Sequence, residues 1–566
     1  MRGFLRTSLI GVAVCAASTL LHAKALACGG FFCNASQPVN QAAEGIIFAD
    51  NGDGTTTAVI QILYQGPSQS FSWLLPISSA PQSDDDIGIA SNLALQRLQR
   101  ATNPSYALTT KVLGTCREVS NNSGCGASMA EDSGASGPRG VDIDPSVGDG
   151  VTVEASGVVG AFEWTVIALD QTLLDPAGSA VDWLKANGYD VPSSAPALLG
   201  PYLQSGLKLL ALRLTKGADA GSIRPIVLTY AGTQPSIPVK LTAVAANDDM
   251  GVLTWVLGKS RAVPANYLSL QLNEARINWF NAASNYNAVV TEAANDAGGQ
   301  GFVTELAGPT NSLAGQIWTA ADVQNWNSLS NTTTQPNTGF FNLAYQQYGQ
   351  WDGFWDATRA AVTLPGGQTL DDLKQCPTCY PVQFALPAYV AELEKEVIEP
   401  VRRVQSLIDA HPEITRLYTT LSADEMTLDP LFAFNSDLPN VSNVHTADRI
   451  VECNPNVYQS DAPWRVELPQ GDVVWGTAAT WPAELSTLPP NRVIARTSET
   501  GSGKVLEDNS DAITAQLATY NSGKSAQSSD GGCATGRSGR QSGGALFAAA
   551  VLFAAALRRR LRSSGR

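Results

Sequence analysis

Three strand-like segments near the start of the chain, at residues 46–48, 55–64 and 71–75, place the strongest constraint on its fold. They are rich in β-branched, aromatic and other apolar residues, which favour pleated, partly buried strands. The sequence DNGDG at residues 50–54 separates the first two segments, and GPS at residues 66–68 separates the second from the third. Both separators contain residues that favour tight turns. The pattern predicts a three-stranded antiparallel meander.

The first 27 residues have the layout of an export signal. Two arginines precede a long apolar run, and Ala25 and Ala27 form an A-x-A cleavage motif. We therefore expect signal peptidase to cut between Ala27 and Cys28. A lipoprotein signal also ends at a cysteine, but it usually has leucine where this chain has Ala25. Simple cleavage is the favoured interpretation.

The charge of the chain is unevenly distributed. The whole chain has a formal net charge of −15, whereas residues 28–532 contain 26 basic and 51 acidic residues, a net charge of −25. Such a surface repels nucleic acid and anionic lipid. It suits an exported protein and predicts no nucleic-acid partner.

Six of the nine cysteines form three pairs that are close in sequence. These pairs are Cys28 with Cys33, Cys116 with Cys125, and Cys376 with Cys379. In an exported protein, close pairs predict disulfides that close small loops. The connectivity does not follow from the sequence, and Cys453 could pair with Cys376 or Cys379 instead.

The rest of the chain alternates between expected strands and helices. Strands are expected at residues 151–153, 162–169, 207–214, 226–230, 238–245 and 252–257. Helices are expected at residues 84–100, 174–188, 196–205 and 389–410, the last interrupted by Pro400. Residues 117–150 read as a loop, and residues 280–350 as mixed helix and loop. The chain is therefore expected to form an α+β ectodomain, mainly antiparallel sheet, pinned by disulfides.

Five segments in a fixed order resemble a known family. They are CGGFFC from residue 28, FSWLLPI from residue 71, VGAFEWTVIALD at 159–170, VDWLKANGYDVP at 181–192 and GLKLLALRL at 206–214. Residues 28–350 resemble the uncharacterised bacterial family called domain of unknown function 2330. The resemblance implies an exported protein and supplies no activity and no catalytic residues.

The C-terminal tail resembles a sorting signal. Residues 500–532 are rich in Gly, Ser and Asp and read as a linker that contains a short helix at 512–520. The tail at residues 533–566 follows, and Gly532-Cys533 lies at the junction between linker and tail. The tail contains an apolar run at 545–557, expected to form a hydrophobic helix, and then a cluster formed by Arg558, Arg559 and Arg560. These parts resemble the tripartite myxobacterial signal MYXO-CTERM. The resemblance implies an intramembrane sorting protease, cleavage near Cys533 and anchoring at the cell surface; the alternative is a permanent tail anchor in the membrane.

Two groups of residues are candidates for chemistry. Cys376 and Cys379 have the C-x-x-C spacing of thiol oxidoreductases, but that chemistry needs a lowered thiol pKa, usually at a helix N-terminus. The flanking residues do not predict this context, so a structural disulfide is favoured. His445 lies near Asp448 and Glu452 in sequence and could serve a hydrolase, although no G-x-S-x-G motif is present. A structural histidine is the favoured interpretation.

Three further patterns favour structural roles. A zinc site formed by the C-x-x-C pair with Cys453 and His445 is a remote alternative. His411 follows an expected helix and meets its dipole favourably. The WDGFWD motif at residues 351–356 contains tryptophans that could bind sugar, but buried tryptophans are commoner and core packing is favoured. No catalytic residue, metal ligand or cofactor is predicted.

The expected organisation is a signal peptide at 1–27, the family-like part at 28–350, a helical and loop part at 351–499, the linker and the tail. We expect an exported envelope protein anchored at the cell surface through its tail. Its expected partners are signal peptidase, a sorting protease, the membrane and a surface ligand. A binding or structural module is favoured over an envelope hydrolase or thiol oxidoreductase.

Overall fold

A computed structural model of the chain describes residues 40–65, 72–83, 86–117, 150–189, 191–192, 194–215, 223–243, 246–332, 335–522 and 524. Within this part the fold is a mixture of helices and several sheets, and it contains disulfides, as the sequence predicts. The expected export signal, Cys28, Cys33, Cys125 and the whole tail lie outside the described residues.

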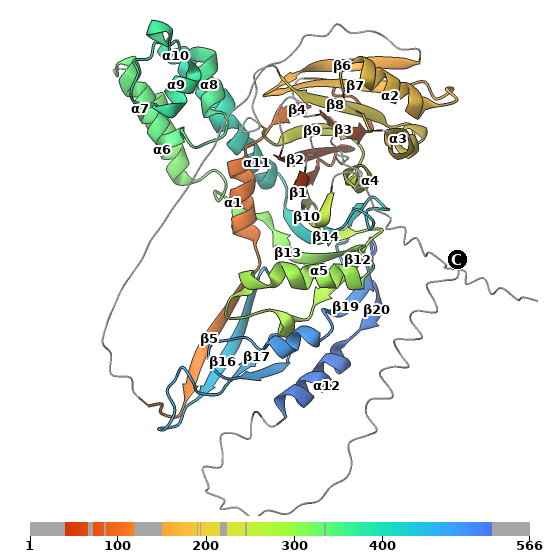
Figure 1. The fold of residues 1–566 in the computed structure, drawn as a ribbon, viewed down its shortest axis with the longest axis vertical. Helices are drawn as coiled ribbons and strands as arrows, with labels where there is room; N and C mark the ends of the chain where they lie inside the picture. Colours follow the sequence, from red (N-terminus) through yellow and green to blue (C-terminus); the bar gives the residue numbers. More distant parts are fainter. Residues whose placement is uncertain are drawn as a thin grey trace, which may run out of the picture. The chain divides into compact units, whose positions relative to one another are not determined.

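The largest sheet of the described residues has ten strands and combines segments from most of the chain (Figure 1). In spatial order its strands are β20 (Lys504–Asp508), β19 (Asn491–Arg496), β12 (Leu268–Leu272), β13 (Gly301–Pro309), β14 (Glu413–Leu421), β10 (Ala246–Gly258), β1 (Asn40–Asp50), β2 (Thr55–Gln65), β9 (Ile226–Ala231) and β4 (Ile87–Ile89). β1 and β2 form the expected hairpin. In its turn, Asp50 accepts a hydrogen bond from the Gly52 amide, and Asp53 from the Thr55 amide.

Two four-stranded sheets, one two-stranded sheet and the helices complete the described fold. The first small sheet has the order β3 (Ser72–Ile77), β8 (Lys208–Leu214), β7 (Phe162–Leu169), β6 (Val151–Val159), and the second β18 (Val473–Gly476), β17 (Trp464–Glu467), β16 (Val444–Glu452), β5 (Ser105–Leu113). β11 (Ala262–Pro264) pairs with β15 (Phe432–Phe434). The α-helices are α1 (Asn92–Thr102), α2 (Pro176–Ala186), α3 (Ala195–Gln204), α4 (Val239–Thr242), α5 (Tyr286–Asp296), α6 (Ala320–Ser330), α7 (Asn337–Tyr348), α8 (Phe354–Ala361), α9 (Leu370–Gln375), α10 (Leu386–Leu393), α11 (Glu399–Asp409) and α12 (Ser510–Asn521).

The predicted three-stranded meander is wrong in its third strand. β3 pairs with β8 in a separate sheet, whereas β2 has β9 as its second neighbour. β1 in turn pairs in parallel with β10. The local sequence predicts these strands but not their partners, because pairing between distant segments leaves no local pattern.

Alternate side chains of β1 point to opposite faces of the ten-stranded sheet, and each face packs against a different layer. Ile46 and Phe48 join a core shared with β3, β7 and β8, so the first four-stranded sheet packs on this face. Ile47 and Ala49 point to the opposite face and pack with α1 and α11. Because α2 and α3 cover the outer side of the four-stranded sheet, the order of layers is helix, sheet, sheet, helix.

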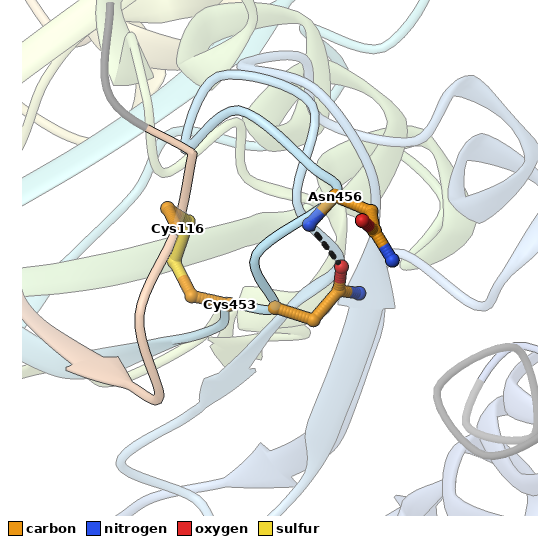
Figure 2. Close-up of a disulfide and its surroundings, with 4 residues drawn as sticks. Cys116, Cys453 and Asn456 are labelled. Atoms are coloured by element: carbon orange, nitrogen blue, oxygen red, sulfur yellow. Dashed lines mark hydrogen bonds between the residues drawn. A yellow bond between two sulfur atoms is a disulfide. The ribbon is translucent and has the colours of Figure 1, made fainter.

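A disulfide joins the ends of β5 and β16, which run in parallel. Figure 2 shows this bond between Cys116 and Cys453, whose separation in sequence is 337. In the turn after Cys453, the backbone N–H of Asn456, also drawn there, donates to Asn454 Oδ1. The expected pairing of Cys116 with Cys125 is therefore wrong. The register of β5 against β16 brings the two strand ends together, with Cys453 directly after β16 and Cys116 three residues after the end of β5.

The helix expected at 389–410 is present, but its interruption is a widened turn. The π-helical turn Glu394–Ile398 connects α10 to α11, and Pro400 lies in the first turn of α11. Proline has no backbone N–H, so the hydrogen bond that a regular helix would need is absent at this point. A π turn accommodates this loss without ending the helix.

Several other local predictions differ from the structure. The helix expected at 84–100 is replaced by the strand β4 at Ile87–Ile89, and the helix α1 begins only at Asn92. The part expected to be helix and loop at 351–499 also contains the strands β14 to β19. Residues 238–245, expected to be a strand, contain the short helix α4. Residues 280–350 contain β13, a strand inside the ten-stranded sheet. The expected linker at 500–532 begins with the strand β20, and the short helix expected inside it at 512–520 is present as α12, whose Ile513 and Leu517 are buried in the core. This part of the expected linker is folded because α12 has two apolar residues to bury.

Candidate functional site

A groove of about 460 Å³ opens on the face of the ten-stranded sheet that also carries α1. We call it the Arg416 groove. Its lining residues are Gly45, Gln61, Gln99, Asn103, Pro104, Tyr106, Gly251, Leu253, Trp255, Ala282, Ala283, Tyr286, Asn287, Glu305, Arg416 and Tyr418. They come from the sheet, from the C-terminal end of α1 with the start of β5, and from the start of α5. The volume is in the usual range for small-molecule sites.

Two glycines leave the floor of the groove open. Gly45 lies in β1 and Gly251 in β10, and both belong to the face that α1 covers further along. A Cβ atom at Gly251 would lie 3.1 Å from Tyr418 Oη, and one at Gly45 would lie 2.9 Å from Gln61 Oε1. Side chains at these positions would therefore occupy the groove.

A buried ion pair lies in the groove. Arg416 Nε donates to Glu305 Oε2 at 2.5 Å, and the two side chains are only 5% and 1% exposed. Glu305 is the additional residue of a β-bulge, because β13 places Thr304 and Leu306 opposite consecutive residues of β14. Bulges of this kind redirect side chains and are common beside functional sites. Tyr286 Oη donates to the other carboxylate oxygen, Glu305 Oε1, at 2.6 Å.

Arg416 is also held by the C-terminal end of α1. Its Nη1 donates to Gln99 O at 3.1 Å and to Thr102 Oγ1 at 2.9 Å, and its Cζ lies 5.6 Å from the centroid of the Trp255 ring. The negative end of the helix dipole favours a cation there. Nη2 has no hydrogen-bond partner among the described residues, so the guanidinium retains a donor for a ligand.

Three tyrosines of the groove stay protonated at neutral pH. Burial raises the pKa of Tyr418 to about 12. Burial, followed by the charges of Glu274 and Glu305, raises the pKa of Tyr106 still further. Burial and then the charge of Glu305 raise the pKa of Tyr286 well above its ordinary value. All three phenols are therefore neutral hydrogen-bond donors.

His445 lies behind Tyr106 and contacts a different acid from those near it in sequence. Its Nδ1 lies 2.7 Å from Glu274 Oε1, and its ring stacks on Tyr106 with centroids 4.5 Å apart. Asp448 pairs instead with Lys111, and Glu452 with Arg465. Glu274 Oε2 is buried without a hydrogen-bond partner among the described residues. Glu274 orients the imidazole of His445, but the described residues that line the groove include no serine, cysteine or histidine.

The other candidate residues have structural contacts. Cys376 and Cys379 form the expected disulfide, and Cys376 caps the C-terminal end of α9. The negative end of a helix dipole does not lower a thiol pKa, so the context is the opposite of a redox site. His411 is buried and bridges Leu407 O and Asp50 O. No cluster of three or more potential metal ligands occurs within the described ranges.

The WDGFWD motif is partly core and partly the edge of a second hollow of about 410 Å³. Phe354 is fully buried, whereas the tryptophans Trp351 and Trp355, expected to pack in the core, are half-buried. Asp352 Oδ2 accepts hydrogen bonds from Ser91 Oγ and Leu93 N and thereby caps α1. The motif therefore joins the helical region to α1.

The family model described as "Uncharacterized protein conserved in bacteria (DUF2330)" matches residues 22–315, more than half of the chain. The chain belongs to this family. No curated protein and no solved structure matches it. The DUF2330 region supplies Tyr106, Tyr286 and Glu305 to the groove, whereas Arg416 and Tyr418 lie beyond it.

Our sequence reasoning missed the groove. A signal was present, because Glu305 and Arg416 each interrupt an apolar strand-like run, VTELA at 303–307 and ITRLY at 414–418. A charge inside a buried strand needs a partner. The two runs are distant in sequence, so only the fold identifies them as each other's partner.

No helix in the described part of the chain is both long enough and apolar enough for a membrane span. The apolar run at 545–557 lies outside this part.

Proposed function

We propose that this DUF2330 protein is exported, is anchored at the cell surface through its tail, and binds a ligand in the Arg416 groove. Two features of the sequence support export and sorting: the A-x-A motif before Cys28 and the tripartite tail that begins at Gly532. Membership of a bacterial family and the disulfides of the described part are consistent with an extracellular protein.

The observation that carries the binding proposal is the ion pair of Arg416 and Glu305. A buried ion pair is a weak source of stability, because desolvation offsets the attraction between the charges. Here a β-bulge and a helix end orient the pair in an open groove, and the guanidinium retains one free donor. Buried charges in a cleft are typical of functional sites.

A thermal-shift screen with a library of polar metabolites tests the binding proposal. The Cβ of Gly251→Ala would enter the groove beside Tyr418, whereas that of Gly308→Ala in β13 would meet only Asn440, at 3.8 Å. At least one compound should raise the melting temperature of the wild type and of Gly308→Ala but not of Gly251→Ala. If no compound does so, or if Gly251→Ala responds like the wild type, the groove is not the binding site.

Mass spectrometry of the protein recovered from its native envelope tests export and sorting. A mature N-terminus at Cys28 and a C-terminus at or just before Cys533 are the expected results. A chain that still carries Leu561 and Arg562 would contradict sorting and would indicate a retained tail anchor.

The contact of His445 with Glu274 favours a second candidate function, hydrolysis assisted by His445 as a general base. A carboxylate at Nδ1 orients the imidazole and fixes its tautomer, as in known triads. Wild type, His445→Gln and Glu274→Gln should then be compared on a panel of chromogenic esters and glycosides. Turnover that falls in both variants while the melting temperature is retained would support an enzyme. Turnover absent from the wild type would remove this candidate.

A further inference from the structure

We infer that the Arg416 groove selects an uncharged, hydroxyl-bearing ring, such as one sugar unit of a neutral glycan. This inference rests on the proposed binding function and adds the class of ligand. Three properties of the groove lead to it: the balance of charge, the free hydrogen-bonding groups and the aromatic walls.

The charge of the groove is balanced. Among the described residues of its lining, Glu305 and Arg416 alone are charged, and they neutralise each other through a direct contact. An anionic ligand near Arg416 would lie close to Glu305, and a cationic ligand near Glu305 would lie close to Arg416. Neither kind of ligand would find an uncompensated opposite charge to offset the loss of its hydration. The groove therefore favours a ligand without charge.

The free polar groups of the groove suit hydroxyls. The side chains of Gln99, Asn103 and Asn287 are exposed at the rim and make no hydrogen bond to described residues. Each amide offers donors and acceptors together, as a hydroxyl group does. Tyr418 Oη and Arg416 Nη2 likewise have no hydrogen-bond partner among the described residues and add groups deeper in the groove.

Aromatic rings provide the apolar surface that a sugar ring needs. Tyr106 and Tyr286 lie with their ring centroids 6.1 Å apart, and both are half-buried, so part of each ring faces the groove. The faces of aromatic rings are apolar while their polar tips can hydrogen-bond. A sugar has the same division, because its C–H groups form apolar patches between its hydroxyls. A purely aromatic ligand would gain no hydrogen bonds from the amides at the rim.

Isothermal titration calorimetry with the purified full chain tests the inference. The probes are three neutral trisaccharides, chitotriose, cellotriose and maltotriose, and trigalacturonate as a charged counterpart. At least one neutral probe should bind, with at least tenfold higher affinity than trigalacturonate. Tyr418→Phe and Asn287→Ala should each weaken this binding about fivefold, as expected for the loss of one hydrogen bond. The control Gln346→Ala, on the exposed side of α7, should not change it.

Each contrary result overturns the inference in a distinct way. Equal or tighter binding of trigalacturonate would contradict the selection against charge. Binding that Tyr418→Phe and Asn287→Ala leave unchanged would place the sugar outside the groove. If no trisaccharide binds, the inference is wrong, and the metabolite screen then decides the proposed function separately: a shift lost in Gly251→Ala would retain the groove as a site for another ligand class.

Discussion

At the scale of single residues, the most distinctive feature of this molecule is a pair of opposite charges buried in its core. Arg416 and Glu305 are almost completely buried, and each depends on the other for its compensation. Glu305 also accepts from Tyr286, and Arg416 donates to the end of α1. Such a network fixes the geometry of the groove but makes each member sensitive to loss of another.

Removing one partner of this ion pair should destabilise the folded protein. Arg416→Met leaves the carboxylate of Glu305 buried without a counter-ion, and we expect the free energy of unfolding to fall by about 3–5 kcal/mol. Arg465→Met is the matched control, because Arg465 pairs with Glu452 and Glu467 where solvent reaches all three. Its loss should be about 0–1 kcal/mol. Urea unfolding measures both values, and similar losses would contradict the proposed importance of burial.

Asp322 should make stability depend on acid pH. Burial alone would raise the pKa of its carboxyl, but hydrogen bonds from Arg97 and Thr319 outweigh burial and lower the pKa below its ordinary value. A lowered folded-state pKa gives stability that is present above the unfolded-state pKa, about 4, and is lost as the pH falls through the folded-state value. Asp322→Asn should therefore reduce the free energy of unfolding at pH 7 by about 1.5–3 kcal/mol, the range for a hydrogen bond to a charged group. The difference from the wild type should narrow near pH 3; a constant difference would show that the charge of Asp322 is not involved.

At the scale of secondary-structure elements, long-range pairing organises the fold. β5 and β16 are distant in sequence, pair in parallel and are joined by Cys116–Cys453 just beyond their ends. The bulge in β13 acts on the same scale, since one additional residue brings Glu305 beside Arg416. Both features depend on register, which a local pattern does not reveal.

The two described disulfides should differ in their contribution to stability. Cys116–Cys453 closes a loop with a sequence separation of 337, whereas the separation of Cys376 and Cys379 is 3. Because a longer loop loses more conformational entropy in the unfolded state, Cys116→Ala with Cys453→Ala should cost about 2–5 kcal/mol. Cys376→Ala with Cys379→Ala should cost clearly less. Chemical unfolding of both double variants compares them, and equal losses would contradict the entropic explanation.

At the scale of the whole molecule, the family match ends inside a continuous sheet. It stops at residue 315, yet β14 lies between β10 and β13, and β16 pairs with β5. The compact unit that contains residue 315 extends as far as Asn521, so no boundary between compact units lies at residue 315. The family-matched part therefore shares its main sheet with the segment that follows it.

A truncated chain tests this interdependence. Residues 28–315 alone would expose the facing edges of β10 and β13, and unpaired strand edges promote aggregation. We expect this fragment to be aggregated or to lack a near-UV circular dichroism signal, whereas residues 28–524 should be monodisperse and show one. A stable, soluble 28–315 fragment would show that the family-matched part folds without β14.

The sequence alone was sufficient for the features that depend on neighbours in the chain. Turn residues and strand propensity predicted the β1–β2 hairpin, and the close spacing of Cys376 and Cys379 favoured the bond that they form. Only the tertiary structure decided that β3 leaves β2, that Cys116 joins Cys453, and that Glu305 meets Arg416. The physical reason is that strand register and the compensation of buried charges depend on contacts between segments that are distant in sequence, and these contacts form only when the chain is folded.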